Sequence, residues 1–361
     1  MKNTPFKAQH EALGAKMVDF AGWYMPLQYD GLKIEHERVR TGVGVFDVSH
    51  MGEFIIRGAD AFSLVQWVTA NDVSKLYDGK VQYSCLTREN GGIVDDLLVY
   101  RIDSKTYMLV VNASNIQKDW DWIQSQNRWA GVECINISNR TALLAVQGPK
   151  AMDALQSLTE MDLHSMEFYT LQKGVFAGVE NVLISTTGYT GAGGVEIYFD
   201  EEHAQTIWDA VFRAGESLNI GPAGLGARDT LRTEMGFCLY GNDITDETTP
   251  LEAGLGWITV LDSDFCGADA LRSQKNGGLT RRLVGFEMIE RGIPRKDYPI
   301  VTKEGEVIGV VTSGTMSPSL DKAIGMGYVN WGYHQKDTTL YIQIRNKQIQ
   351  AQVVRPPFYK G

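Results

Sequence analysis

Residues 91–100 of the chain read GGIVDDLLVY, a pattern typical of a tight turn followed by a β-strand. Two glycines permit a sharp backbone reversal at little steric cost, and the apolar, partly β-branched run after them favours a strand. Side chains alternate along a strand, so Asp95 and Asp96 should point to opposite faces. Both faces are otherwise apolar, so at least one carboxylate should lie beside buried surface. Two interpretations stay open: an aspartate that stabilises the fold by bonding to the backbone of the turn, or a functional site.

The composition is that of an ordinary globular protein, with 43% apolar and 22% charged residues. A length of 361 residues suggests two or three domains. The net charge of -10, from 34 basic and 44 acidic residues, argues against extensive nucleic-acid binding as the main role. No apolar run reaches membrane-spanning length, and the first residues lack the apolar core of a signal peptide. We therefore expect a cytoplasmic protein that binds neither nucleic acid nor membrane.

Cysteines and histidines are scattered along the chain. The four cysteines contain no Cys-x-x-Cys pair, which indicates buried thiols in a reducing compartment and neither a disulfide framework nor a zinc site. The six histidines are equally dispersed. We expect no metal site.

The sequence pattern changes twice along the chain. Residues 1–50 mix short apolar runs with aromatic turns, the middle alternates strands with amphipathic helices, and the part beyond about residue 280 holds only strands and turns. We predict helices over 59–69, 150–158 and 206–218, and strands over 106–112, 283–288, 307–312, 339–345 and 348–354. The last four strands predict a small all-β barrel at the C-terminus.

A glycine-rich segment, residues 187–197, reads TGYTGAGGVEI. Glycines let a ligand approach the backbone, Tyr189 offers a stacking face, and Glu196 offers a bidentate acceptor. A phosphate-binding loop is excluded, because no Gly-Lys-Ser/Thr follows and no helix is expected there. On these residues alone we favour the alternative, a glycine-rich hairpin whose glutamate is a solvated strand residue.

Three more residues have two interpretations each. Arg228, at an expected helix start, could grip a carboxylate through its planar fork or form a structural pair with Asp229. Asn112, at a strand end, could read heteroatoms at a ring edge or cap a turn. Trp257 could be part of the core or a stacking wall for a ligand.

Taken together, the motifs resemble those of a known family, the aminomethyltransferases, or T-proteins of the glycine cleavage system. Any one motif is weak, but eight occur in the family's order and spacing, from near residue 10 to the end of the chain. They are FAGW (20–23), FDVSHM (46–51), GGIVDDL (91–97), LLAVQGP (143–149), GYTG (188–191), ARDTLR (227–232), LYGND (239–243) and TSG (312–314). One departure is Ala192, where the family usually has an acidic residue.

The resemblance implies a multidomain α+β folate-binding aminomethyltransferase fold, with three domains around a central channel. We expect residues 1–279 to form the folate-binding region and residues 280–361 to form a C-terminal β-barrel domain. Within the first region, the resemblance implies two interleaved α+β subdomains, residues 1–52 with 139–279, and residues 53–138.

The resemblance also implies a reaction. An aminomethyl group on the lipoyl arm of a separate carrier, the lipoylated H-protein, would be the carbon donor, and tetrahydrofolate would be the co-substrate. The products would be 5,10-methylenetetrahydrofolate, ammonia and the dihydrolipoyl carrier. Alignment of the reacting atoms and management of protons are then the catalytic problems.

Roles for individual residues follow from the motif match. Asp96 would be the catalytic carboxylate, orienting the nucleophilic folate nitrogen and stabilising developing positive charge. Glu196 would read the donor edge of the pterin, and Tyr189 and Met51 would flank its rings. The residues expected to line the folate site are Met51, Asn112, Tyr189, Glu196, Arg228 and Trp257. For Arg228 two roles stay open, at the folate tail or on the side that faces the carrier.

Proteins with related folds carry two other functions. One is a folate-binding iron–sulfur assembly protein without transferase activity, but its Lys-Gly-Cys-Tyr-x-Gly-Gln-Glu motif has no counterpart here, where residues 187–191 read TGYTG. The other is the folate domain of a sarcosine or dimethylglycine oxidising enzyme, whose flavin domain with a Gly-x-Gly-x-x-Gly fingerprint this chain lacks.

A carrier-docking surface is expected to be local. The net charge of -10 disfavours long-range attraction to an acidic carrier, so a basic patch should make the contact. The candidates are Arg291, Arg295 and Lys296, or Lys75 and Lys80.

Overall fold

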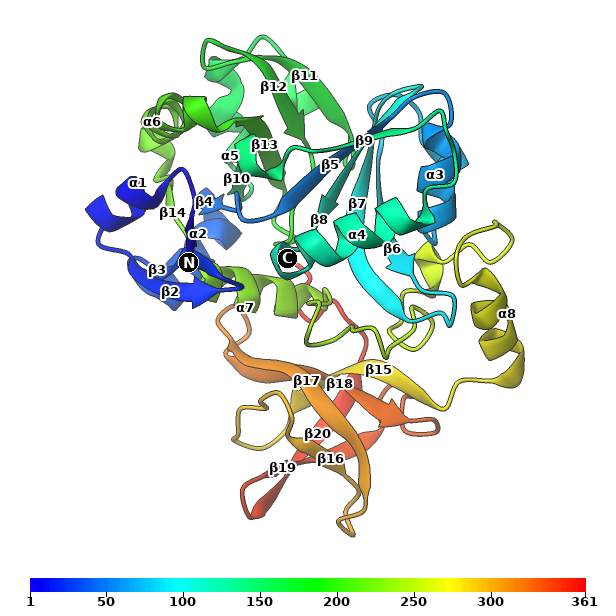
Figure 1. Ribbon diagram of the computed structural model, residues 1–361. Coiled ribbons are helices and arrows are strands. Elements are labelled where there is room, and N and C mark those ends of the chain that lie inside the picture. Colours follow the sequence, from blue (N-terminus) through cyan, green and yellow to red (C-terminus); the bar gives the residue numbers. More distant parts are fainter. The chain divides into compact units, whose positions relative to one another are not determined.

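A computed structural model describes residues 1–361, which form two compact units built from interleaved stretches of the chain (Figure 1). The first unit comprises Met1–Val65, Val73–Tyr83 and Leu97–Asp229, and the second comprises Gln66–Asp72, Ser84–Asp96 and Thr230–Gly361. Strand β7 (Ile93–Asp103) is divided between them, so Asp96 belongs to the second unit and Tyr100 to the first. The domain boundaries implied by the resemblance stay predictions.

A six-stranded sheet is the largest layer of the first unit, with the strand order β11-β12-β13-β10-β4-β14. All neighbours are antiparallel except β14 and β4, which run parallel. The strands are β4 (Gly44–Asp47), β10 (Thr141–Gln147), β11 (Leu171–Phe176), β12 (Val179–Ser185), β13 (Gly194–Asp200) and β14 (Gly221–Pro222).

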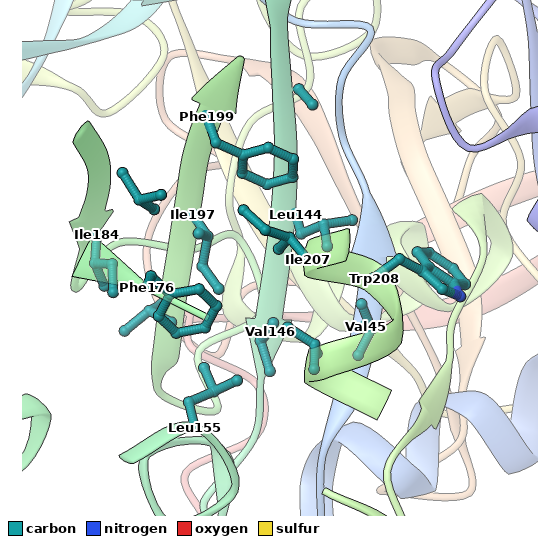
Figure 2. Close-up of a cluster of buried hydrophobic side chains, with 14 of the residues drawn as sticks. Val45, Leu144, Val146, Leu155, Phe176, Ile184, Ile197, Phe199, Ile207 and Trp208 are labelled. Carbon is teal, nitrogen blue, oxygen red and sulfur yellow. The ribbon is translucent and has the colours of Figure 1, made fainter. Parts of the chain in front are cut away.

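One face of this sheet forms the main hydrophobic core, against helices α5 (Ala151–Leu155) and α6 (Ala204–Ala214) (Figure 2). Val195, Ile197 and Phe199 of β13 all point into this core. Because side chains alternate along a strand, Glu196 and Tyr198 must lie on the opposite face. The apolar half of β13 thereby fixes the direction of its polar half.

A five-stranded sheet, in the order β6-β7-β8-β5-β9, contains Asp96 in β7. The remaining strands of this sheet are β5 (Gly52–Arg57), β6 (Val81–Thr87), β8 (Thr106–Val111) and β9 (Glu133–Asn136). Met51 directly precedes its strand β5, and Asn112 directly follows its strand β8. Val110 of β8 lies opposite Leu98 on β7 and Glu53 on β5, and Met108 lies opposite Tyr100 on β7. Glu53, Leu98 and Tyr100 therefore share one face of the sheet.

Four further helices and a small sheet belong wholly or partly to the first unit. Trp120 of α4 packs edge-on against Phe54, with ring centres 5.1 Å apart, on the sheet face that Glu53 does not occupy. Helix α3 follows β5, and α1 and α2 accompany the small sheet β1-β3-β2 at the N-terminus. These elements are β1 (Lys2–Asn3), β2 (Lys16–Phe20), β3 (Trp23–Gln28), α1 (Lys7–Ala12), α2 (Leu32–Thr41), α3 (Ala61–Val68) and α4 (Ile116–Gln126).

The predicted C-terminal barrel is confirmed in the second unit as a closed barrel with the strand order β15-β18-β17-β16-β19-β20. Strand β18 was not predicted, because Gly325 and Gly327 give it the look of a turn region. A Cβ on Gly325 would lie 2.6 Å from the Phe286 ring, so these glycines serve close packing across the barrel. The strands are β15 (Arg281–Met288), β16 (Pro299–Val301), β17 (Val307–Ser317), β18 (Lys322–Asn330), β19 (Thr339–Ile344) and β20 (Lys347–Val354).

Two further helices complete the fold, α7 (Leu225–Met235) and α8 (Ala268–Gly277). In the second unit, the buried Arg232 of α7 donates to Asp243 at 2.7 Å and to Ser313 of β17 at 2.8 Å, which fixes the C-terminal half of α7 to the barrel. The three predicted helices are confirmed as α3, as α5 with the short 3₁₀ helix Gln156–Leu158, and as α6. None of the helices combines the length and apolar character that a membrane span requires.

Candidate functional site

The candidate residues fall into two groups, one in each unit. Met51, Asn112, Tyr189, Glu196 and Arg228 lie in the first unit. Asp96 and Trp257 lie in the second.

The glycine-rich segment is a loop between the antiparallel strands β12 and β13. Gln147 pins both sides of this loop, because its Nε2 donates to the carbonyl oxygens of Thr187 (3.1 Å) and Val195 (3.2 Å) and its Oε1 accepts from Thr190 Oγ1 (2.8 Å). A Cβ on Gly188 would lie 2.0 Å from Gln147 Oε1, so a larger residue there would displace the side chain that makes these bonds. The hairpin is thus confirmed, and its tip is rigidly anchored.

Glu196 is buried within this hairpin, with 7% of its surface exposed. Its Oε2 accepts from Thr187 Oγ1 at 2.5 Å and lies 3.3 and 3.5 Å from the hydroxyls of Tyr198 and Tyr100. No protein group donates to Oε1. The expectation of a solvated strand glutamate is therefore wrong: the side chain is buried, and three hydroxyls hold one of its carboxylate oxygens.

The hydroxyls around Glu196 form one connected network. The Tyr100 and Tyr198 hydroxyls lie 2.7 Å apart, and Ser185 Oγ lies 2.9 Å from Thr187 Oγ1. Burial, followed by the charge of Glu196, raises the pKa of both tyrosines well above the ordinary value, so both remain hydroxyl donors. Sequence reasoning missed this network, although the period-two pattern of β13 placed Tyr198 beside Glu196.

Arg228 lies at the start of α7, where its guanidinium stacks over the Tyr189 ring at 4.7 Å from the ring centre. It makes no ion pair with Asp229, so the structural-pair interpretation is wrong. Burial lowers the pKa of Arg228, and the nearby Tyr189 and Glu196 oppose that shift. An arginine stays charged at neutral pH in any case, so a cation stacked on Tyr189 lies within electrostatic range of Glu196.

Met51 belongs to the turn after β4, where its amide donates to the Val48 carbonyl at 3.1 Å. The preceding His50 is buried, and its Nδ1 has no hydrogen-bond partner. Burial, then the charge of Arg228, lowers the pKa of His50 to about 4, so its imidazole is neutral at pH 7. Asn112 directly follows β8 and begins a 3₁₀ turn, but its side chain makes no capping bond, so the turn-capping interpretation is wrong.

In the second unit, the two aspartates of β7 have different surroundings. Asp95 is fully buried, whereas Asp96 is partly exposed, which confirms that they point to opposite faces. The amides of Gly91 and Gly92 donate to the Arg88 carbonyl (2.8 Å) and to Asn90 Oδ1 (3.0 Å). The turn therefore does not need a carboxylate from either aspartate to satisfy these amides.

Two buried thiols lie within electrostatic range of Asp96. Burial, with a contribution from Asp96, raises the pKa of Cys85 and of Cys238 well above the ordinary value, so both thiols are neutral. Trp257 lies in the short 3₁₀ helix Gly256–Ile258 with 72% of its surface exposed, so the core interpretation is wrong. No cluster of three or more His, Cys, Asp or Glu side chains could hold a metal ion.

Comparison with known proteins gives one consistent family. Residues 6–263 match the family described as the GCVT N-terminal domain, and residues 281–360 match the glycine cleavage T-protein C-terminal barrel domain. The chain is 59% identical over 360 residues to the aminomethyltransferase of Flavobacterium psychrophilum, with 100% of both chains covered. It is 47% identical to that of a Geobacillus species, covering 100% of this chain and 99% of the other.

A solved structure agrees over nearly the whole length. The glycine cleavage system aminomethyltransferase T from Bartonella henselae superposes with a TM-score of 0.93 at 34% identity. The alignment covers 99% of this chain and 98% of that one. The similarity thus includes both units and the barrel.

Proposed function

The chain belongs to the glycine cleavage T-protein family of aminomethyltransferases, and we propose that it moves a one-carbon unit from an aminomethyl-loaded lipoyl carrier to tetrahydrofolate. The carrier would be the lipoylated H-protein, and the products would be 5,10-methylenetetrahydrofolate, ammonia and the dihydrolipoyl carrier. The alternative of an iron–sulfur assembly protein is not favoured, because the full-length relatives are aminomethyltransferases. A cytoplasmic location is part of the proposal.

The arrangement of Glu196 is the observation that carries the proposal. A pterin presents adjacent N–H donors along one edge, and an ionised carboxylate is the natural acceptor for such an edge. Three hydroxyls already hold Oε2 in place, so Glu196 needs little reorganisation when a ligand binds at Oε1. Tyr189, Met51 and Asn112 would complete the recognition of the rings.

The stacked pair of Arg228 and Tyr189 suits a ligand that is both aromatic and anionic. Its guanidinium donors would bind a carboxylate, and the ring that it covers is held in one orientation. Trp257, exposed on the second unit, would offer a further stacking face. No metal is proposed to take part in binding.

Asp96 is proposed as the catalytic carboxylate. The donor carbon must lose its bonds to nitrogen and sulfur and gain bonds to two folate nitrogens. The two protons that leave those nitrogens end on the departing amine and on the lipoyl sulfur, so the reaction needs no external proton. A carboxylate beside the nucleophilic nitrogen would orient it and stabilise the cationic iminium that forms when ammonia leaves.

Product analysis tests the proposal. We expect tetrahydrofolate and a carrier loaded with a ¹³C-labelled aminomethyl group to give ¹³C-labelled methylenetetrahydrofolate, observed by NMR, only when the protein is added. A labelled carbon that remains on the carrier, with tetrahydrofolate present, would contradict the proposal. Omitting tetrahydrofolate is the matched control.

A further inference from the structure

Glu53 is a buried acid for which the proposed reaction has no role. It lies on β5 with none of its surface exposed, and neither carboxyl oxygen has a hydrogen-bond partner. Its backbone groups are satisfied: the amide donates to Ser138 Oγ at 2.9 Å, and the carbonyl accepts from the Ile137 amide at 3.0 Å. An unpaired, fully buried carboxyl group is uncommon enough to need an explanation.

The strand register places Glu53 toward the Glu196 network. Glu53 shares its sheet face with Tyr100, and the Tyr100 hydroxyl reaches Tyr198 and Glu196 on the polar face of β13. The two sheets of the first unit therefore meet through these polar side chains. Glu53 and Glu196 interact electrostatically across that boundary.

The groups around Glu53 do not favour its ionised form. Glu196 and Tyr198 on β13 interact electrostatically with Glu53, and Tyr100 and Asp96 alternate along β7 onto the sheet face that Glu53 shares. Val110 lies opposite Glu53 on β8, and no basic group forms an ion pair with Glu53. Burial, followed by repulsion from Glu196, raises the pKa of Glu53 well above the ordinary value.

We propose that Glu53 is a positioning residue that acts through Glu196. It holds a proton between the two sheets, so the network carries a single negative charge, located on the carboxylate that faces the ligand. This inference rests on the proposed binding of folate at Glu196. Glu53 itself, which is fully buried, does not touch the ligand.

Coupling between the two acids gives the inference a measurable consequence. When the pterin donates hydrogen bonds to Glu196, it compensates part of the negative charge there. Ionisation of Glu53 then costs less free energy. Folate binding should then favour loss of the Glu53 proton. By reciprocity, loss of that proton should strengthen folate binding, so affinity should rise with pH.

The test compares the wild type with Glu53→Gln, which is neutral at every pH and keeps the shape of the acid. Anaerobic calorimetric titration with tetrahydrofolate should give equal affinities at pH 7, within about twofold. As the pH is raised above 7, the wild-type affinity should rise, by up to about tenfold per pH unit where Glu53 titrates, whereas that of Glu53→Gln should stay flat. Glu202→Gln, an exposed acid outside the network, should behave as the wild type does.

Infrared spectroscopy of the ligand-free protein provides an independent readout of the proton. The wild type and Glu202→Gln should show the carbonyl stretch of a buried protonated carboxylic acid at pH 7, and Glu53→Gln should lose that band. Tetrahydrofolate should shift the band in the wild type, but not in Glu196→Gln. Parallel affinity curves, or a missing band, overturn the role of Glu53 while leaving folate binding intact; a wild type that binds no tetrahydrofolate overturns the proposed function as well.

Discussion

The guanidinium of Arg228 lies over the ring of Tyr189, 4.7 Å from its centre, and so connects the start of α7 to the glycine-rich hairpin. Gln147 donates to carbonyl oxygens on both sides of the hairpin, and Glu196 accepts from Thr187 within it. One cation, one aromatic ring and one oriented carboxylate are thereby held by separate elements of the first unit. Their positions are fixed before any ligand binds, which reduces the cost of ordering them.

Replacing Arg228 by lysine should weaken tetrahydrofolate binding. Lysine keeps the positive charge but loses the planar stack on Tyr189 and the forked donors. We expect a loss of roughly three- to thirtyfold in affinity, measured by calorimetry. Tyr189→Phe keeps the ring and serves as the control, so it should bind much as the wild type does. Equal affinities for wild type and Arg228→Lys would show that the stack has no part in binding.

Glu196→Gln should weaken tetrahydrofolate by roughly ten- to a hundredfold, because a charged acceptor is exchanged for an amide that presents donors to donors. Thr187→Val should cause a smaller loss, since it removes only the hydroxyl that orients Oε2. Calorimetric titration of both variants beside Glu202→Gln separates the contact from its support. If Thr187→Val were the worse of the two, Glu196 would not be the direct acceptor.

His50 should make stability depend on pH. Its pKa in the folded chain, about 4, lies below the ordinary value of 6.5, so between these values the unfolded chain binds a proton that the folded chain excludes. The stability is complete above pH 6.5 and falls as the pH drops towards 4. Between pH 7 and pH 5 the contribution of His50 alone is a loss of about 2 kcal/mol in the free energy of unfolding, which appears as the difference between the wild type and His50→Gln. Glu53, whose pKa is raised, changes stability in the opposite direction, and it does so equally in both proteins.

Urea unfolding of the wild type and of His50→Gln at the two pH values checks this expectation. The variant should lose less stability on acidification, whereas His203→Gln, at a more exposed position, should follow the wild type. A wild-type curve no steeper than that of His50→Gln would contradict the assignment. Asp47 does not affect this comparison. Burial raises the pKa of Asp47, but the hydrogen bond from His10 lowers it by more, so the net pKa lies below the ordinary value of 3.8. The stability that Asp47 contributes is therefore lost mainly below pH 3.8.

Local patterns in the sequence predicted much of the fold. Alternation along β7 separated Asp95 from Asp96, and the change of texture near residue 280 predicted the barrel. Strand β18 escaped notice because its glycines serve contacts with Phe286 and Val310, which are distant in sequence. Helix α2, in the first 50 residues, was also not predicted. Its Glu35 carboxylate accepts from the amides of Tyr29, Gly31 and Gly224, and no local sequence motif predicts such contacts.

In the candidate site, too, local motifs were informative but contacts between distant residues were not predictable. Motifs singled out Glu196, Tyr189 and Arg228, but residue types alone left each with two interpretations. The hydroxyls of Tyr100 and Thr187 decide between them for Glu196, and Tyr100 comes from another sheet. Glu53 gave no signal, because a glutamate in a strand is normally solvated and only the register shows that this one faces a second acid.

Carrier docking should depend on Arg291 and Arg295, which are both exposed. Lys296 of the same predicted patch donates to the Gly241 carbonyl (2.7 Å) and to Asn242 Oδ1 (2.9 Å), so it has a structural role. Charge reversal of both arginines should raise the KM for loaded carrier several-fold and reduce its dependence on salt, with tetrahydrofolate binding unchanged. Unchanged kinetics would place the docking surface elsewhere, and Lys75 and Lys80 would be tested next.

The central claim is that Asp96 drives folate-dependent transfer from a loaded carrier, and release of ammonia from that carrier measures it most directly. The wild type should release ammonia quickly only when tetrahydrofolate is present. Asp96→Asn should lose roughly a hundredfold or more of that rate while still binding tetrahydrofolate, because it keeps the shape and loses the charge. Asp95→Asn, on the buried face of β7, should lose less turnover. Equal losses in the two variants, or release that does not need tetrahydrofolate, would contradict the account.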